Sequence, residues 1–276
     1  MRSRCSLYVD VGYLLSSAAA RMTGTSLRTG IHVDYERLID ELVQQARRMS
    51  ELPLLRVHWY DSARDGVPDS RQQLIGELPK VKLRLGRFGV DGQQKGVDLR
   101  LGLDLVTHAR NGAADVFILV SGDDDLTEAV EEAQVHGVQV ILLAVPTTEN
   151  RPHSISRHLI RAADGLEVLP PEAIDQTVTR AELPPATPPP ARTGQEDPAE
   201  LAGEIDSVVG NVLAAFRTSA TAGALAELEA GKPSIPRDID KALLTDLSDR
   251  RGELDLNEQV RHKLRAQFWK KYDETP

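Results

Sequence analysis

The sequence predicts a three-layer α/β/α domain, in which helices cover both faces of a parallel sheet, followed by a small α-helical module. Two observations predict the sheet. Short β-rich runs alternate with helical patterns over the first part of the chain, and these runs are apolar throughout rather than on one face only. A third observation predicts the module, because amphipathic helical patterns follow a proline-rich segment.

Five apolar runs are expected to form the strands of the sheet. They cover residues 6–12, 54–60, 81–88, 115–122 and 138–145. The helix after the first of these runs has Asp34 as a plausible N-cap, and its apolar residues recur at helical spacing. Two further helices are expected over 97–110 and 126–137, and the second ends at Gly137, a residue type favoured just after a helix.

The composition divides the chain into three parts. We expect a domain over residues 1–170, a proline-rich linker over 171–198 and a helical module over 199–276. The helices of this module are expected to serve formation of a homo-oligomer or binding of a protein partner.

Composition also indicates the cellular compartment in which the protein is expected. The chain has 276 residues with 41% hydrophobic content, enough for a substantial core. The single cysteine, Cys5, excludes an internal disulfide framework and fits a reducing compartment. Asp10 interrupts the N-terminal apolar run, and no run is apolar for long enough to span a membrane. We therefore expect a soluble cytoplasmic protein without a membrane partner.

Acidic residues follow the apolar runs or begin the helices. Asp10 lies near the carboxyl end of the first strand, and the triplet Asp123–Asp125 follows the fourth. Ligands of such sheets bind beyond the carboxyl ends of the strands. Clustered carboxylates suit Mg²⁺ or Mn²⁺ rather than zinc, and such an ion promotes in-line attack on a phosphodiester. Asp98 and Asp104 lie six residues apart, about 120° around one helix, so they are not expected to face one spot unless the helix begins after Asp98.

These acidic residues also carry a family resemblance. The order "YVDVGYL", "KGVDLRLGLD", "SGDDDL" and "SISRHLIRAADGLEVL" resembles the NYN domain family of PIN-like metal-dependent ribonucleases, over residues 5 to 170. The resemblance implies a PIN-like fold and cleavage of RNA with Mg²⁺ or Mn²⁺. It implies Asp10, Asp98, Asp123 and Asp125 as the catalytic and metal-binding acids. Ser121 and Gly122 would shape the loop that carries the triplet, and Lys95 would approach a phosphate.

One position departs from the family. The family commonly has Asn three residues after the first Asp, and this sequence has Tyr13 there. The amide that helps hold a metal-bound water would then be missing. A catalytically weak or inactive RNA-binding scaffold with the same fold therefore stays an alternative to a ribonuclease.

Basic residues follow the fifth strand. The stretch 151–161 concentrates Arg151, Arg157 and Arg161 at the sheet edge that carries the acids, and we expect it to contact the RNA backbone. Lys82 and Arg84 alternate along the third strand and are expected to guard a solvated edge. His58 and His108 are expected to be packing or surface residues, and Asp124 is expected to face solvent or cap a helix.

Two other enzyme classes fit the sequence less well. A phosphatase of the haloacid dehalogenase type needs a second Asp two residues after the first, where this chain has Gly12. A dinucleotide-binding protein needs a G-x-G-x-x-G motif after the first strand, and the sequence has none there.

Overall fold

The computed structural model describes residues 3–63, 66–88, 94–181, 198–251 and 256–274. At residues 87–88, 94–95, 198–200, 219 and 222 it describes the backbone alone. The chain forms two compact units, of which unit 1 comprises residues 1–18 and 33–178. Unit 2 comprises residues 19–32 and 179–276. Segment 19–32 thus belongs with the C-terminal helices, which the sequence did not indicate.

Unit 1 is built on a mostly parallel sheet, which in the described residues has the strand order β5-β4-β3-β1-β6-β7-β8. Its parallel strands are β1 (Cys5–Asp10), β3 (Leu54–Ala63), β4 (Val81–Phe88), β6 (Val116–Val120), β7 (Gln139–Ala144) and β8 (Gly165–Val168). The short strand β5 (Gln94–Lys95) runs antiparallel to β4. All five predicted strands are confirmed, and β8 is an additional one.

The strand order places β1 at the middle of the sheet. From β1 the chain builds outward through β3 to β4, then returns to place β6 on the other side of β1. This is the order of a doubly wound sheet, and the crevice at the reversal, between β1 and β6, is where such sheets bind ligands. Asp10 ends β1, and Ser121 directly follows β6.

The first strand is shorter than predicted. We expected it to reach residue 12, but it ends at Asp10, and α1 (Val11–Thr23) begins at the next residue. The Asp10 carboxylate accepts the Tyr13 N–H at 3.2 Å, which is the contact of an N-cap residue. The apolar run continues past Asp10 because α1 is itself largely buried, so hydrophobicity did not mark the boundary.

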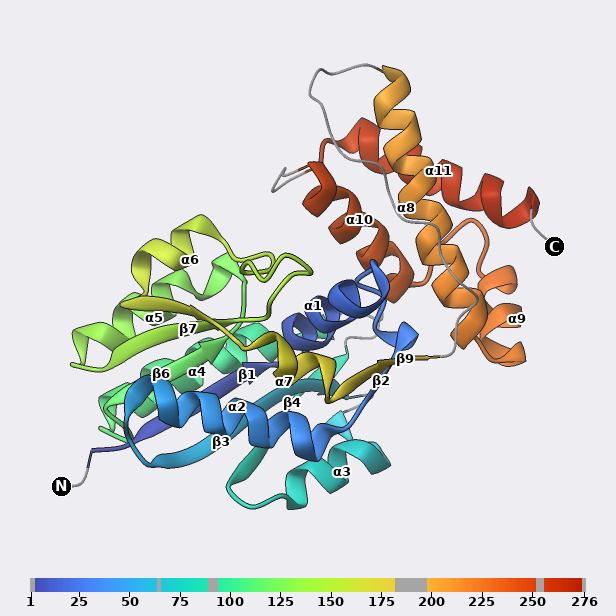
Figure 1. Cartoon of the computed structure of the whole chain (residues 1–276). Helices are drawn as coiled ribbons and strands as arrows, with labels where there is room; N and C mark the ends of the chain where they lie inside the picture. Colours follow the sequence, from blue (N-terminus) through green and yellow to red (C-terminus); the bar gives the residue numbers. More distant parts are fainter. Residues whose placement is uncertain (1–2, 64–65, 89–93, 182–197, 252–255, 275–276) are drawn as a thin grey trace. The chain divides into compact units, whose positions relative to one another are not determined.

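Helices cover both faces of the sheet, as predicted (Figure 1). One face carries α2 (Tyr35–Ser50) and α3 (Ser70–Glu77), and the other carries α4 (Val97–Arg110), α5 (Thr127–Val135) and α6 (Arg157–Ala162). Asp34 is the N-cap of α2, since its carboxylate accepts the Arg37 N–H at 3.2 Å. The predicted helix over 97–110 is confirmed as α4, whereas α5 ends two residues before the expected boundary. The three-layer α/β/α class is therefore confirmed.

Part of the expected linker 171–198 is structured. Residues Pro171–Asp175 form α7, and β9 (Val178–Arg180) pairs with β2 (Ile31–Val33) in a small second sheet. Pro171 occupies the first helical position, where its missing N–H costs nothing, so proline there starts a helix instead of marking a linker. Residues 182–197 of the expected linker lie outside the described residues.

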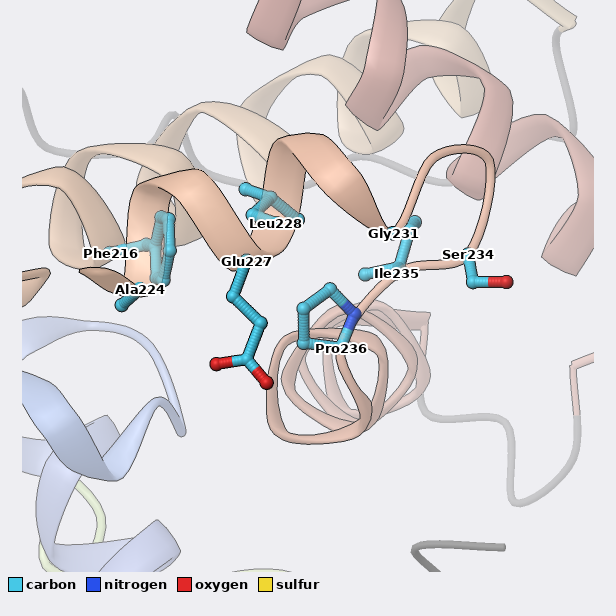
Figure 2. A pocket seen from close by; sticks show the side chains of 8 residues that line it. All are labelled: Phe216, Ala224, Glu227, Leu228, Gly231, Ser234, Ile235 and Pro236. Carbon is cyan, nitrogen blue, oxygen red and sulfur yellow. The ribbon is translucent and has the colours of Figure 1, made fainter. Parts of the chain in front are cut away.

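Unit 2 is helical. It contains α8 (Pro198–Ser219), α9 (Ala222–Ala230), α10 (Arg237–Arg251) and α11 (Glu258–Glu274) around an apolar core that includes Leu27 from segment 19–32. The loop before α10 and the ends of α8 and α9 enclose a pocket of about 360 Å³ (Figure 2). Phe216, Leu228, Ile235 and Pro236 give it an apolar lining, and Glu227 adds a carboxylate. Within the described ranges, no helix is both long and apolar enough to cross a membrane.

Candidate active site

Asp10 is fixed at the carboxyl end of the central strand. It is buried, with 9% of its surface exposed. A buried carboxylate is costly unless its oxygens have hydrogen-bond or charge partners. Asp10 Oδ1 accepts the Tyr13 N–H, and Oδ2 accepts the Ser121 hydroxyl at 3.1 Å. Both oxygens are thereby oriented by neighbouring groups.

Ser121 connects the ends of β1 and β6. It is fully buried directly after β6, and β1 and β6 are paired up to Val9 and Val120. Its hydroxyl donates to Asp10 and accepts the Asp123 N–H at 3.3 Å. One side chain therefore links Asp10 to the acidic triplet across the reversal of the strand order.

The three acids of the triplet have different surroundings. Asp123 is half-buried and accepts the Asp125 N–H at 3.1 Å, which caps a short 3₁₀ turn over Asp124–Leu126. Asp124 and Asp125 are exposed. The Asp124 carboxylate accepts the Ser156 hydroxyl and lies 3.4 Å from His158 Nδ1, and these two contacts hold the pKa of Asp124 below its ordinary value. Asp124 thus faces outward as expected, but it also ties the triplet to α6.

The two acids of α4 are separated, as their spacing predicts. Asp98 is exposed in the first turn of α4, after Gly96 with φ 93°. Asp104 is half-buried, accepts the Tyr60 hydroxyl at 2.9 Å and lies 3.1 Å from Arg84 Nε. Arg84 does not stand free in solvent as expected, because it is half-buried and ion-paired with Asp104 of α4.

The donor set at the strand ends consists of oxygen atoms. Among the described residues, no group of three or more His, Cys, Asp and Glu side chains is arranged to hold a metal ion. Asp10 and Asp123 nevertheless lie at adjacent strand ends, because the Ser121 hydroxyl donates to the Asp10 carboxylate and accepts the backbone N–H of Asp123. Mg²⁺ is often held by only one or two carboxylates, with water and substrate phosphates at its other positions. These two residues therefore fit a hard divalent cation, and an oxygen-only set does not favour zinc.

The segment after β7 folds as a narrow hairpin beside this edge. Pro146 pairs with Pro152, and the His153 N–H donates to the Val145 carbonyl at 2.9 Å. The Tyr13 hydroxyl donates to the His153 carbonyl at 2.8 Å and accepts the Val145 N–H at 3.3 Å. Tyr13 therefore contacts both chains of the hairpin at its base.

The expected basic contacts lie on or after this hairpin. Arg151 is exposed near its turn and ion-paired with Glu149. Arg157 and Arg161 are exposed on α6, one helical turn apart. Lys95 lies in β5, but its side chain is outside the described part of the structure.

Sequence reasoning missed one buried polar group near the site. Asp61 is a buried acid in β3, satisfied by Gln72 Nε2 and the Ser62 N–H, each at 2.8 Å. The predicted strand ended at residue 60, so no sequence pattern marked Asp61 as a buried carboxylate. His58, expected to be a packing or surface residue, is buried and stacks on Tyr8 with ring centroids 4.8 Å apart. Burial lowers the pKa of His58 to about 3, so this histidine is a neutral core residue.

This combination defines a class of protein. The doubly wound α/β/α sheet, with a buried Asp ending its central strand and further acids at the neighbouring strand end, is a PIN-like, nuclease-like architecture. The sequence model of the NYN domain matches residues 4–170, and the chain belongs to the NYN domain family.

Other comparisons add one relative. A stretch of 74 residues is 43% identical to the uncharacterized protein y4oD of Sinorhizobium fredii (strain NBRC 101917 / NGR234). This stretch is 27% of the present chain and 35% of that protein, so the similarity spans about a third of the relative's length. No solved structure matches the chain.

Proposed function

We propose that this protein is a divalent-metal-dependent ribonuclease that cleaves RNA phosphodiester bonds at the carboxyl ends of β1 and β6. The observation that carries the proposal is the buried Asp10, oriented by Ser121 and joined through it to Asp123. Strongly oriented, buried carboxylates at a ligand-binding edge are typical of functional sites. Membership of the NYN domain family supports the nuclease class.

Asp10 and Asp123 would hold Mg²⁺ or Mn²⁺. Asp98, in the first turn of α4, and Asp125, in the 3₁₀ turn after Asp123, would complete the acidic site. When bound, such an ion activates water and neutralises charge on the phosphate. Ser121 keeps the Asp10 carboxylate in one orientation, so that an Asp10 oxygen does not have to reorganise when the cation binds.

The basic residues would hold the RNA backbone. Arg157 and Arg161 lie one helical turn apart and are exposed, so their guanidinium groups can contact neighbouring phosphates of one strand. Arg151 and Lys95 would extend this contact. The overall charge of −9 means that RNA binding depends on this local group of cations rather than on the whole surface.

The experiment compares wild type with Asp10→Asn on labelled single-stranded RNA, with Mn²⁺, with Mg²⁺ and with EDTA. We expect cleavage by wild type that requires the ion and a loss of at least about a hundredfold in Asp10→Asn. Asp69→Asn is the matched control, because Asp69 caps α3 in the same unit and Asn also caps helices well. Absence of ion-dependent cleavage by wild type would refute the nuclease proposal.

A second candidate function is an RNA-binding scaffold of the same fold with weak or no cleavage. Tyr13 favours it, since the phenol at this position is committed to the hairpin and offers no amide to the site. RNA binding by wild type that is weakened by Arg157→Ala, without any ion-dependent cleavage, would support this function over the first.

For unit 2 we propose a role in self-association or in binding a protein partner. Its helices enclose an apolar core of their own, which is typical of a separate domain, and such a domain can serve as an interaction module. Sedimentation of the full chain measures self-association directly.

A further inference from the structure

We propose that Tyr13 is a positioning residue, which fixes the hairpin 145–153 and the basic residues that follow it beside the acidic site. This inference rests on the proposed function for its effect on RNA. It explains why the chain has a tyrosine where an amide was expected.

The backbone of Tyr13 belongs to the acidic site. Its N–H donates to Asp10 Oδ1 at 3.2 Å, as part of the cap of α1. The position of the Tyr13 Cα is therefore set by the same carboxylate that is proposed to hold the cation.

The hydroxyl of Tyr13 completes the base of the hairpin. In a regular antiparallel pair, the carbonyl and the N–H of facing residues bond to each other directly. Here the His153 N–H donates to the Val145 carbonyl, as in a regular pair. The Val145 N–H and the His153 carbonyl are instead bridged by the Tyr13 hydroxyl, which accepts from Val145 and donates to His153. Without the hydroxyl, one N–H and one C=O in a half-buried position would lose their shared partner, which is unfavourable.

The ring of Tyr13 fills the space between the hairpin and the loop of the triplet. A side-chain carbon on Gly122 would lie 2.9 Å from Tyr13 Cε2 and would also collide with the Ser154 carbonyl. Gly122 is therefore needed for the close approach of the two loops, and its carbonyl accepts the Ser156 N–H at 3.0 Å. Ser156 in turn contacts Asp124 and caps α6.

These contacts form a continuous path from Asp10 to the basic residues. It runs from Tyr13 to the hairpin, which carries Arg151, and from the hairpin through Ser156 to α6, which carries Arg157 and Arg161. A residue that holds this path fixed sets the distance between the phosphate-binding cations and the acids. Such a residue affects capture of RNA more than the chemical step.

The test uses the full-length chain with Tyr13→Phe, which removes the hydroxyl and keeps the ring. Tyr35→Phe is the matched control, because Tyr35 is also half-buried in unit 1 and its hydroxyl accepts a hydrogen bond from Arg71 away from the site. Tyr13→Asn is the third variant, because it supplies an amide near Asp10 but is too short to bridge the hairpin.

Hydrogen exchange of the backbone gives a readout that does not depend on activity. We expect faster exchange of the Val145 and His153 amides in Tyr13→Phe and Tyr13→Asn, with Tyr35→Phe like wild type. Kinetics on labelled RNA with Mn²⁺ give the second readout. We expect KM to rise roughly five- to tenfold in both Tyr13 variants, the effect of one lost buried hydrogen bond, with kcat within about twofold of wild type.

Two results would overturn the inference. Exchange of the hairpin amides in Tyr13→Phe at the wild-type rate would show that the hydroxyl does not hold the hairpin. A rise in kcat in Tyr13→Asn with unchanged KM would show that the position acts on the metal-bound water instead. If wild type neither binds nor cleaves RNA, the proposed function fails and the effect on RNA fails with it, while exchange still decides whether Tyr13 holds the hairpin.

Discussion

The Ser121 hydroxyl donates a hydrogen bond to Asp10 Oδ2 at 3.1 Å, across the point where the strand order of the sheet reverses. The same hydroxyl accepts the N–H of Asp123. The two strand ends are therefore joined by a side chain that is itself fully buried, and water has little access to the bond. This arrangement makes the geometry of Asp10 a property of the fold rather than of a flexible loop.

Ser121→Ala is expected to destabilise unit 1 by roughly 1.5–3 kcal/mol, because a buried carboxylate loses a donor and the Asp123 N–H loses an acceptor. The chain has two tryptophans, Trp59 in unit 1 and Trp269 in unit 2, so urea unfolding of 5-fluorotryptophan-labelled protein can be followed by ¹⁹F NMR for each unit separately. The loss should appear in the Trp59 signal. Ser50→Ala is the control away from the site, because it removes a half-buried hydroxyl that donates to the Ala46 carbonyl and accepts the Leu52 N–H at the end of α2.

Gly122→Ala is expected to cost about 1–3 kcal/mol of unfolding free energy, because the added methyl group would press on the Ser154 carbonyl and on the Tyr13 ring. Gly165→Ala is the comparison, since a methyl group there would meet Ile141 at an ordinary contact distance of 3.6 Å. Equal midpoints of urea unfolding for the two variants would contradict the close packing of the two loops.

The sheet could be predicted from the sequence because its strands are buried on both faces and therefore read as continuous apolar runs. Asp10 and Asp123 stood out for the same reason, Asp10 as a charge inside such a run and Asp123 as a charge just after one. The start of α1 could not be read in this way, because the helix after Asp10 is as apolar as the strand before it. Only the capping contact from Asp10 to the Tyr13 N–H marks the boundary.

The contacts between loops could not be predicted from the sequence. The Tyr13 hydroxyl reaches residues more than 130 positions away, and Asp124 reaches Ser156 and His158 on another element. Neither contact has a local pattern, since each depends on how the loops after β6 and β7 approach each other. The packing of Leu27 in the core of unit 2 likewise joins residues far apart in the sequence, so no local pattern predicts it.

The stability of unit 1 is expected to fall in mild acid because of the buried histidine His58. Burial lowers its pKa to about 3, and the neighbouring His108 also has a lowered pKa through burial. The unfolded chain takes up a proton near pH 6.5, whereas the folded chain keeps His58 neutral. The contribution of His58 is therefore complete above about pH 6.5 and is lost as the pH falls from there toward 3.

His58→Phe keeps an aromatic ring stacked on Tyr8 and removes the titration. Between pH 7 and pH 5, the Trp59 signal of this variant should show a smaller loss of stability than wild type, by up to about 1.4 kcal/mol per pH unit. Identical slopes in wild type and His58→Phe would show that His58 becomes protonated in the folded state.

In unit 2, Asp246 holds segment 19–32 against α10. Its carboxylate accepts the Thr25 hydroxyl at 2.5 Å and the Ser26 N–H at 2.9 Å. Asp246 is half-buried in a densely packed part of unit 2. Burial raises the pKa of its carboxyl to about 6, and this effect exceeds that of the two hydrogen bonds, which lower the pKa. Removing the side chain in Asp246→Ala would leave both donors without an acceptor and should destabilise unit 2 by about 1–3 kcal/mol.

Asp246→Asn should have the opposite effect at neutral pH. The folded state binds the Asp246 proton more tightly than the unfolded state. The contribution of Asp246 to the stability of unit 2 is therefore greatest below about pH 4 and declines as the pH rises to about 6, above which the full cost of the buried charge remains. The Asn oxygen can still accept the Ser26 N–H, and its amide can donate to Thr25 Oγ1. Because solvent reaches part of the site, we expect a gain on the order of 1 kcal/mol over wild type at pH 7.5, vanishing near pH 4. The Trp269 signal during urea unfolding at the two pH values measures this gain, and an Asn variant less stable than wild type at both would mean that the charge on Asp246 is itself stabilising.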